Sequence, residues 1–267
     1  GNLAHCRALL MDYSREQTAG HLKFLSRSGE ASNLNLFSPT NLNFNAFVCG
    51  ASGSGKSFLM NSILASFTAD HADGAISIFD VGGSYRKLVG HLGGKSLELN
   101  TQTATALVVE SLRREKLRPN GYCKTVIETL CGSGSHISHS HRVAIEDLLQ
   151  TCEGTPFKIK TLILEAAERK ERAYADLAHW LKPFTHWDDL KTTEIDPAIL
   201  DAKVRAFDFK NLESDPHLQR LAILVLTNRI WSEIKSKGAS RTLVVFDEVW
   251  KFFAQASGFL EEMYRTF

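Results

Sequence analysis

The chain contains 267 residues, a length that allows one large domain or two small ones with a substantial hydrophobic core. Its 43% hydrophobic residues, 23% charged residues and net charge of +1 are ordinary for a globular protein, and they exclude a strong overall attraction to nucleic acid or to a membrane surface. Five scattered cysteines without a C-x-x-C pair favour reduced thiols in a cytosolic protein, and no apolar run approaches the roughly 18 residues of a membrane-spanning helix.

Two short strands are expected before residue 50. The stretch Leu34–Phe37 alternates apolar and polar side chains, which is the pattern of a half-buried strand. Ala46–Cys49 is a short apolar run of strand type that leads into a glycine-rich stretch. Cys49 is therefore expected to be buried and to have a structural role rather than a reactive one.

The stretch Gly50–Ser57 has the spacing G-x-x-x-x-G-K-[ST] of a phosphate-binding loop. Glycines let the backbone turn tightly and point its N–H groups at an anion, Lys56 would reach the β- and γ-phosphates, and the Ser57 hydroxyl would bind Mg²⁺. The helical spacing of Phe58–Leu64 would place the phosphates at a helix N-terminus. The predicted nucleotide-binding residues are Gly50, Ser52, Gly53, Ser54, Gly55, Lys56, Ser57 and Phe58.

A third strand is predicted after the turn signal Asp73–Gly74. Ala75–Phe79 is apolar and ends at Asp80, and Val81–Tyr85 has the composition of a loop. Asp80 has two interpretations: a carboxylate that caps the loop, or a catalytic part of the nucleotide site. The capping interpretation is favoured.

Residues 101–200 change character, and they predict a helical insertion. Four segments have helical patterns: 104–117, 122–131, 141–152 and 161–181. In the last of these, one face carries Leu162, Ala166, Ala173, Leu177 and Leu181. His136, His139 and His141 raise the possibility of a metal site, but no nearby cysteine or carboxylate completes a ligand set, so solvated loop histidines are favoured.

After residue 200 the chain returns to strand patterns. Val204–Phe209 alternates as a strand, and Asp215 and Pro216 have the residue types of an N-cap and a first helical position. The helix that they begin is expected to end before Gly238 and to face the core.

The apolar run Leu243–Phe246 ends in two acids, Asp247 and Glu248. A continuous apolar run is typical of a buried parallel strand, and ligands of parallel sheets gather at the carboxyl ends of strands. Asp247 would bind Mg²⁺ directly or through a water, and Glu248 would orient the attacking water, because phosphoryl transfer depends mainly on positioning and charge stabilisation. Together with the upstream loop, these acids predict nucleotide hydrolysis.

Three stretches resemble the TraC-type large ATPases of bacterial type IV secretion and conjugation systems: "NLNFNAFVCGASGSGKSFLMN", "ISIFDVGGSYRKLVGHLGGKSLELN" and "TLVVFDEVWKFF". The resemblance covers most of residues 20–100 and 203–267, and the Ser-Tyr step in the second stretch is the more discriminating part. Two departures stand out. The chain stops before the family's later strand with its γ-phosphate sensor. The family also places an Asn-Pro-Phe step after the "LELN" strand, whereas here Asn100 is followed by Thr101–Thr103.

The resemblance implies an α/β fold of the RecA-like P-loop NTPase type, in which helices flank a mainly parallel sheet and an all-α subdomain is inserted. The expected parts are a first core segment at 1–100, the insertion at 101–202 and a second core segment at 203–267, with the chain being a C-terminal fragment of a longer protein. The resemblance also implies Mg-ATP hydrolysis and a homo-hexamer that works with other secretion subunits at the cytoplasmic face of the inner membrane. Arg265 is the candidate for an arginine that completes a neighbour's site, against the plainer reading of a surface arginine.

We therefore expect a secretion-system ATPase that drives pilus assembly or the transfer of DNA or protein. One alternative is a DNA-pumping or DNA-coupling ATPase of the FtsK/HerA kind, which steep salt-dependent DNA binding would favour. Another is a nucleotide-dependent assembly scaffold, against which the presence of Glu248 argues.

Overall fold

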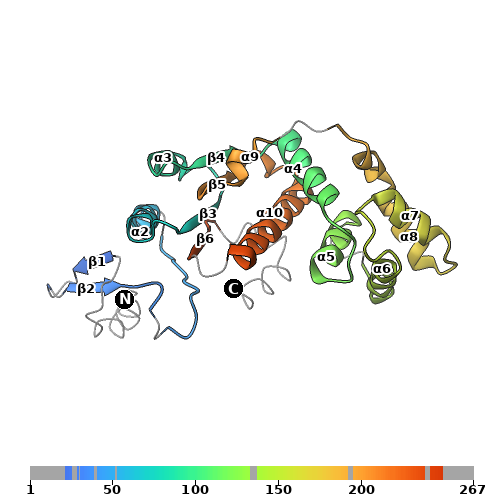
Figure 1. Cartoon of the computed structure of the whole chain (residues 1–267), viewed down its shortest axis with the longest axis horizontal. Helices are drawn as coiled ribbons and strands as arrows, with labels where there is room; N and C mark the ends of the chain where they lie inside the picture. Colours follow the sequence, from blue (N-terminus) through green and yellow to red (C-terminus); the bar gives the residue numbers. More distant parts are fainter. Residues whose placement is uncertain are drawn as a thin grey trace.

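The computed structural model describes most of the chain and places a parallel sheet at its centre (Figure 1). A small antiparallel hairpin of β1 (Leu22–Leu25) and β2 (Ala31–Leu34) comes first. The sheet has the strand order β4-β5-β3-β6, with all neighbours parallel. Its strands are β3 (Ala75–Asp80), β4 (Lys95–Glu98), β5 (Val204–Asp208) and β6 (Thr242–Phe246). The described residues are 22–25, 29, 31–38, 41–51, 53–132, 137–191, 195–237 and 241–248.

Helices cover both faces of this sheet (Figure 1). On one face, Ile76 and Ile78 of β3 belong to a core cluster with Leu64 and Phe67 of α2 (Lys56–Asp70) and with residues of α3 (Arg86–His91). On the other face, Phe79 belongs to a larger cluster built on two further helices. These are α4 (Thr101–Arg114) and α10 (Pro216–Lys237). The alternation along β3 follows from the two-residue side-chain period of a strand.

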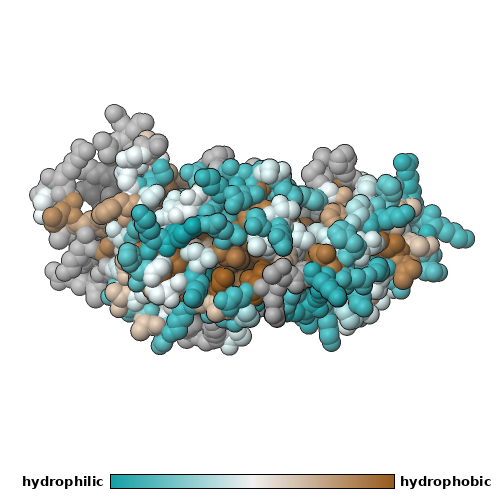
Figure 2. All heavy atoms as spheres, turned by 90° about the horizontal axis from the view of Figure 1, so that it is seen from above, coloured by the Kyte–Doolittle hydropathy of each residue, from teal (hydrophilic) through white to brown (hydrophobic). Residues whose placement is uncertain are grey.

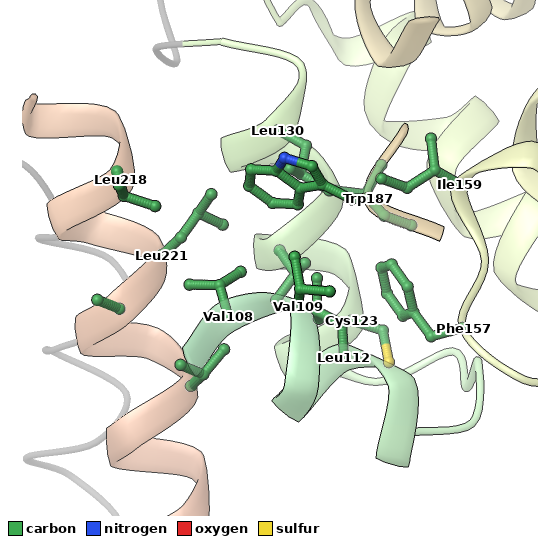
Figure 3. Close-up of a cluster of buried hydrophobic side chains, with 14 of the residues drawn as sticks. Val108, Val109, Leu112, Cys123, Leu130, Phe157, Ile159, Trp187, Leu218 and Leu221 are labelled. Carbon is green, nitrogen blue, oxygen red and sulfur yellow. The ribbon is translucent and has the colours of Figure 1, made fainter. Parts of the chain in front are cut away.

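The segment between β4 and β5 is helical, and it extends away from the sheet beyond α4 (Figure 1). One continuous core joins it to the sheet layer: Trp187 lies between Leu130 and Ile159, while Val108 of α4 faces Leu221 of α10 (Figure 3). The insertion is therefore packed onto the same helices that cover the sheet. Beyond α4 its elements are α5 (Gly121–Leu130), α6 (His139–Thr151), α7 (Ile159–Ala167), α8 (Arg172–Leu181), the 3₁₀ helix η1 (Lys182–Asp188) and α9 (Pro197–Leu200). A second 3₁₀ helix, η2 (Lys210–Leu212), follows β5.

Most predicted elements are confirmed, and three are wrong. The single helix expected over 161–181 is two helices, because α7 ends at Ala167 and α8 starts at Arg172. The chain turns back between them, so that α7 and α8 pack against each other. Leu34–Phe37 is not a strand, since β2 ends at Leu34 and the next residues turn.

The strand expected at Ala46–Cys49 is also absent from the described residues. Residues 41–51 form neither helix nor strand, and Phe47 and Val48 are exposed. Phe44 contacts Phe37, which in turn contacts Phe67 near the end of α2, so the segment runs back along this helix to its start. A strand requires a neighbour for its ladder hydrogen bonds, and no described strand lies beside this segment.

Helix α10 is tied to the sheet by a buried arginine. The Arg205 side chain on β5 is only 4% exposed, and its Nη2 donates to Glu233 Oε2 of α10 at 2.7 Å. Its Nε donates to Ser77 Oγ on β3 at 2.9 Å, and Nη1 donates to the Leu200 carbonyl. Within the part of the chain that the structure describes, no helix is both long and apolar enough to cross a membrane, and the face seen in Figure 2 is mostly hydrophilic.

We expect Glu233→Ala to lower the free energy of unfolding by about 3 kcal/mol, because it leaves a buried guanidinium without its carboxylate partner. The matched control is Glu110→Ala, which removes the 2.6 Å pair with Arg114 on the surface of α4 and should cost about 0.5 kcal/mol. Urea unfolding of both variants measures the difference. Equal losses would contradict a role for this pair in holding α10 to the sheet.

Candidate functional site

The loop before α2 has the backbone geometry that its glycines predict. Gly53 and Gly55 have φ angles of 73° and 92°, a left-handed conformation that costs little only for glycine. The Ser54 N–H donates to the Ala51 carbonyl at 3.1 Å and closes the turn. At Gly50, a Cβ would lie 2.5 Å from Ser54 Oγ, so a side chain there would force Ser54 to move.

Lys56 is the first residue of α2, and its Nζ forms hydrogen bonds with backbone carbonyls of the loop. It donates to the carbonyls of Gly50 at 2.8 Å and Ala51 at 3.1 Å. The helix start has no side-chain cap, since its N-cap is Gly55, and its first turn holds no acidic residue. Ser57 and Phe58 on this turn are exposed. The uncapped N–H groups and the positive end of the helix dipole therefore suit an anion.

Three aspartates form an acidic row at the carboxyl edge of the sheet. Asp80 pairs with Asp208 in the parallel register of β3 and β5. Phe79 pairs with Phe246 in the register of β3 and β6, and the Asp247 N–H donates to the Phe79 carbonyl at 2.9 Å, which places Asp247 beside Asp80 on the other side. The acidic row therefore consists of Asp208, Asp80 and Asp247, with Asp80 in the middle.

The acidic row lies on the face of the sheet that α2 covers. Ile78, Ala206 and Val245, each two residues before an aspartate of the row, belong to the core cluster that contains Leu64 of α2. Since side chains two positions apart on a strand share a face, the strand period places the three aspartates on this side as well.

The direction of α2 brings the loop toward the same edge. A Cβ added to Gly74, just before β3, would meet the Phe67 ring at 2.8 Å, so the last turn of α2 lies at the amino end of β3. From Phe67 back to Lys56 the helix spans about 16 Å, and a six-residue strand spans about 20 Å. The start of α2 therefore lies toward the carboxyl edge of the sheet.

Each aspartate of the row accepts hydrogen bonds from the loops that follow β3, β5 and β6. Asp208 Oδ1 accepts from the N–H groups of Gly82 and Lys210, both at 3.0 Å. Asp247 accepts from the Tyr85 hydroxyl and from the Glu248 N–H, the latter at 2.9 Å. Burial raises the pKa of the Tyr85 hydroxyl, and the charge of Asp247 raises it further, so this hydroxyl stays a donor.

Asp80 is the most enclosed member of the row. It is 2% exposed and accepts from the backbone N–H groups of Tyr85 and Ser84. Burial raises the pKa of its carboxyl group, the Tyr85 N–H opposes this effect, and the charges of Asp208 and Asp247 add to it. Among the side chains of the described residues, its Oδ1 is one of the few buried oxygens without a hydrogen-bond partner.

Glu248 stands at the end of β6 in a strained conformation. Its φ is 51°, and among the described residues other than glycine it alone has a positive φ. Its side chain is exposed. Strain of this kind persists where surrounding structure holds the backbone in place, and it is frequent at functional sites.

Two predicted site residues, Ser52 and Arg265, lie outside the described residues. Cys49 is exposed, so its predicted burial is wrong, for the same reason that Ala46–Cys49 is not a strand. Sequence reasoning missed Asp208 and Tyr85 as members of the acidic edge. The signal for Asp208 was the strand ending in an acid, and for Tyr85 the Ser-Tyr step in the loop after Asp80.

In the described part of the chain, His139 and His141 belong to no group of three or more side chains that could hold a metal ion. His136 lies outside the described residues, and His139 begins α6. His141 is wrongly predicted as a solvated loop residue. It is half-buried in the first turn of α6, with Nδ1 2.8 Å from Ser138 Oγ and Nε2 3.3 Å from Asp176 Oδ2.

Residues 30–117 match the family profile of the TraG P-loop domain. The chain is 25% identical over 218 residues to the type IV secretion system protein virB4 of Bartonella quintana (strain Toulouse), and equally to virB4 of Bartonella henselae (strain ATCC 49882 / DSM 28221 / CCUG 30454 / Houston 1). Each alignment covers 78% of this chain and 26% of the relative, so the chain spans about a quarter of the length of these curated relatives.

The solved structure of VirB4 of Thermoanaerobacter pseudethanolicus is similar with a TM-score of 0.68 at 18% identity, over 94% of this chain and 75% of that chain. This likeness, the P-loop domain match and the helix-flanked parallel sheet show the RecA-like P-loop NTPase fold with an all-α insertion. The predicted fold class is therefore confirmed.

We expect Gly55→Ala to lower the free energy of unfolding by about 1 kcal/mol, because alanine must then adopt a left-handed conformation. The control is Gly90→Ala inside α3, where an added Cβ meets nothing within 4 Å and φ is not positive. That change should raise stability by a few tenths of a kcal/mol to about 1 kcal/mol. Thermal unfolding of both variants tests whether the two changes have opposite signs.

Proposed function

We propose that this chain is the nucleotide-hydrolysing region of a type IV secretion ATPase. The observation that carries the proposal is the placement of the Gly50–Ser57 loop and Asp247 toward one edge and one face of the sheet. The match to the TraG P-loop domain and the similarity to virB4 proteins support it. ATP is the proposed substrate, on the strength of the family resemblance.

Within this proposal, the loop binds the phosphates through its backbone N–H groups and Lys56. Gly50, Ser52, Gly53, Ser54 and Gly55 are the proposed phosphate-binding residues of the loop, together with Phe58 on the first turn of α2. Lys56 Nζ now holds two loop carbonyls, so it would exchange these for phosphate oxygens when nucleotide binds. Its charge would then stabilise the leaving phosphate.

The oxygen donors at this edge fit Mg²⁺, a hard cation that prefers carboxylate, hydroxyl and water oxygens. The Ser57 hydroxyl and Asp247 would hold the ion, and Tyr85 orients Asp247 by its hydroxyl hydrogen bond. When bound, Mg²⁺ would supply charge stabilisation for the phosphates. Glu248, exposed at the end of β6, would orient the attacking water.

The larger assembly is also part of the proposal. A homo-hexamer would work with other secretion subunits at the cytoplasmic face of the inner membrane, to drive pilus assembly or the transfer of DNA or protein. The helical segment 101–202 would move with hydrolysis, and Arg265 would reach a neighbouring subunit's site. The sequence resemblance and the virB4 relatives support these statements.

Two variants test the proposed hydrolysis. We expect Lys56→Ala to weaken nucleotide binding and to abolish turnover, because it removes the cation at the phosphates. Glu248→Gln should keep nucleotide binding and lower kcat at least about 100-fold, as expected for the loss of a water-orienting acid. Phosphate release and binding of a fluorescent ATP analogue provide the two measurements.

Lys170→Ala and Glu168→Gln serve as matched controls, since both residues are exposed between α7 and α8. They should leave turnover within about twofold of the unmodified chain. Undiminished hydrolysis by Glu248→Gln would show that Glu248 does not orient the attacking water. Nucleotide binding unaffected by Lys56→Ala would show that the loop does not bind the phosphates.

A further inference from the structure

The middle aspartate of the acidic row is not explained by loop capping alone. Asp80 accepts backbone hydrogen bonds from Ser84 and Tyr85, which satisfy part of its carboxylate. Its Oδ1 is fully enclosed and has no partner among the described residues. A buried carboxylate oxygen without a donor costs about 1–3 kcal/mol or more, so a protein retains one where a ligand or water supplies the missing contact.

The surroundings of Oδ1 point to a cation or its hydration shell as this contact. Asp208 and Asp247 flank Asp80 at the same level of the sheet, and both raise its pKa by their charge. Like charges side by side on adjacent strands destabilise a sheet. Oδ1 of each neighbour accepts a hydrogen bond from a loop N–H, whereas Oδ1 of the middle aspartate accepts none.

The row also faces the right way for the proposed nucleotide site. It lies on the α2 side of the sheet, and the start of α2 lies toward the same edge. Tyr85 links the middle member to one outer member, because its N–H donates to Asp80 and its hydroxyl donates to Asp247. Movement of Asp247 toward an ion would therefore be transmitted through Tyr85 to the loop that holds Asp80.

We propose that Asp80 is a positioning residue of the metal site, whose Oδ1 accepts a hydrogen bond from a water bound to the Mg²⁺ that Ser57 and Asp247 hold. This inference rests on the proposed function. Mg²⁺ loses its waters reluctantly, so protein carboxylates in its outer shell fix the ion through these waters. Outer-shell groups of this kind contribute about 10–100-fold to metal affinity.

The test separates metal binding from nucleotide binding. Affinity for a fluorescent ADP analogue is measured for the full 267-residue chain in EDTA and in Mg²⁺, and the ratio of the two affinities is the metal-dependent gain. Asp80→Asn should leave the affinity in EDTA within about twofold and reduce the metal-dependent gain about tenfold or more. An unchanged gain would overturn the proposal. Absence of nucleotide binding by the unmodified chain in both buffers would overturn the proposed function, and this inference with it.

Asp208→Asn is the matched control, because it removes the same charge from the same row. Both hydrogen bonds that the Asp208 side chain accepts from these loops, from Gly82 and Lys210, end on Oδ1, an acceptor that asparagine retains. Its metal-dependent gain should stay within about threefold of the unmodified chain. An equal loss in the two variants would overturn the specific role of Asp80 and would show that only the summed charge matters.

A second measurement uses the unmodified chain and does not depend on the folding of any variant. Fe²⁺ replaces Mg²⁺ in the presence of ADP, and ascorbate with peroxide then generates radicals that cut the backbone beside the metal. We expect cuts near residues 80–84 as well as near Ser57 and Asp247. Cuts confined to the latter two positions would overturn the proposal.

Discussion

The strand β3 lies between β5 and β6, and this position determines the geometry of the carboxyl edge of the sheet. Each of the three strands ends in or just before an aspartate, and the parallel register brings these three carboxylates side by side. The loop after β3 makes this arrangement tolerable, since Tyr85 and Gly82 donate to all three aspartates between them. The loop between β3 and α3 is therefore as important to this edge as the strands themselves.

Local patterns predicted the parts of the site that a short segment can specify. The turn geometry of the Gly50–Ser57 loop follows from its glycines, and the apolar runs before Asp80 and Asp247 predicted two strands, of which β3 is buried and β6, at the edge of the described sheet, is mostly half-buried. Asn100, directly before the residues that depart from the resembling family, caps α4 by accepting from the Thr103 N–H, an arrangement that its residue types allow. In each case the deciding interactions lie within a few residues of one another.

The parts that were not predicted depend on distant segments. Asp80 meets Asp208 because β3 and β5 pair in one register, which no local pattern encodes. Ala46–Cys49 has the composition of a strand but no described neighbour, and pairing rather than composition makes a strand. The break between α7 and α8 contains neither glycine nor proline, so propensity gives no stop signal there, and packing of the two helices decides it.

The strand order also has a consequence for biosynthesis. Ser77 and Arg205, which bond between β3 and β5, are 128 positions apart, whereas helices α6, α7 and α8 of the insertion pack against one another as near neighbours along the chain. Contacts of long sequence separation form late and slowly, so these three helices are able to condense on the ribosome before the sheet. Until residues 242–246 emerge, β3 keeps one edge uncovered, and such an edge is a template for pairing with other nascent chains.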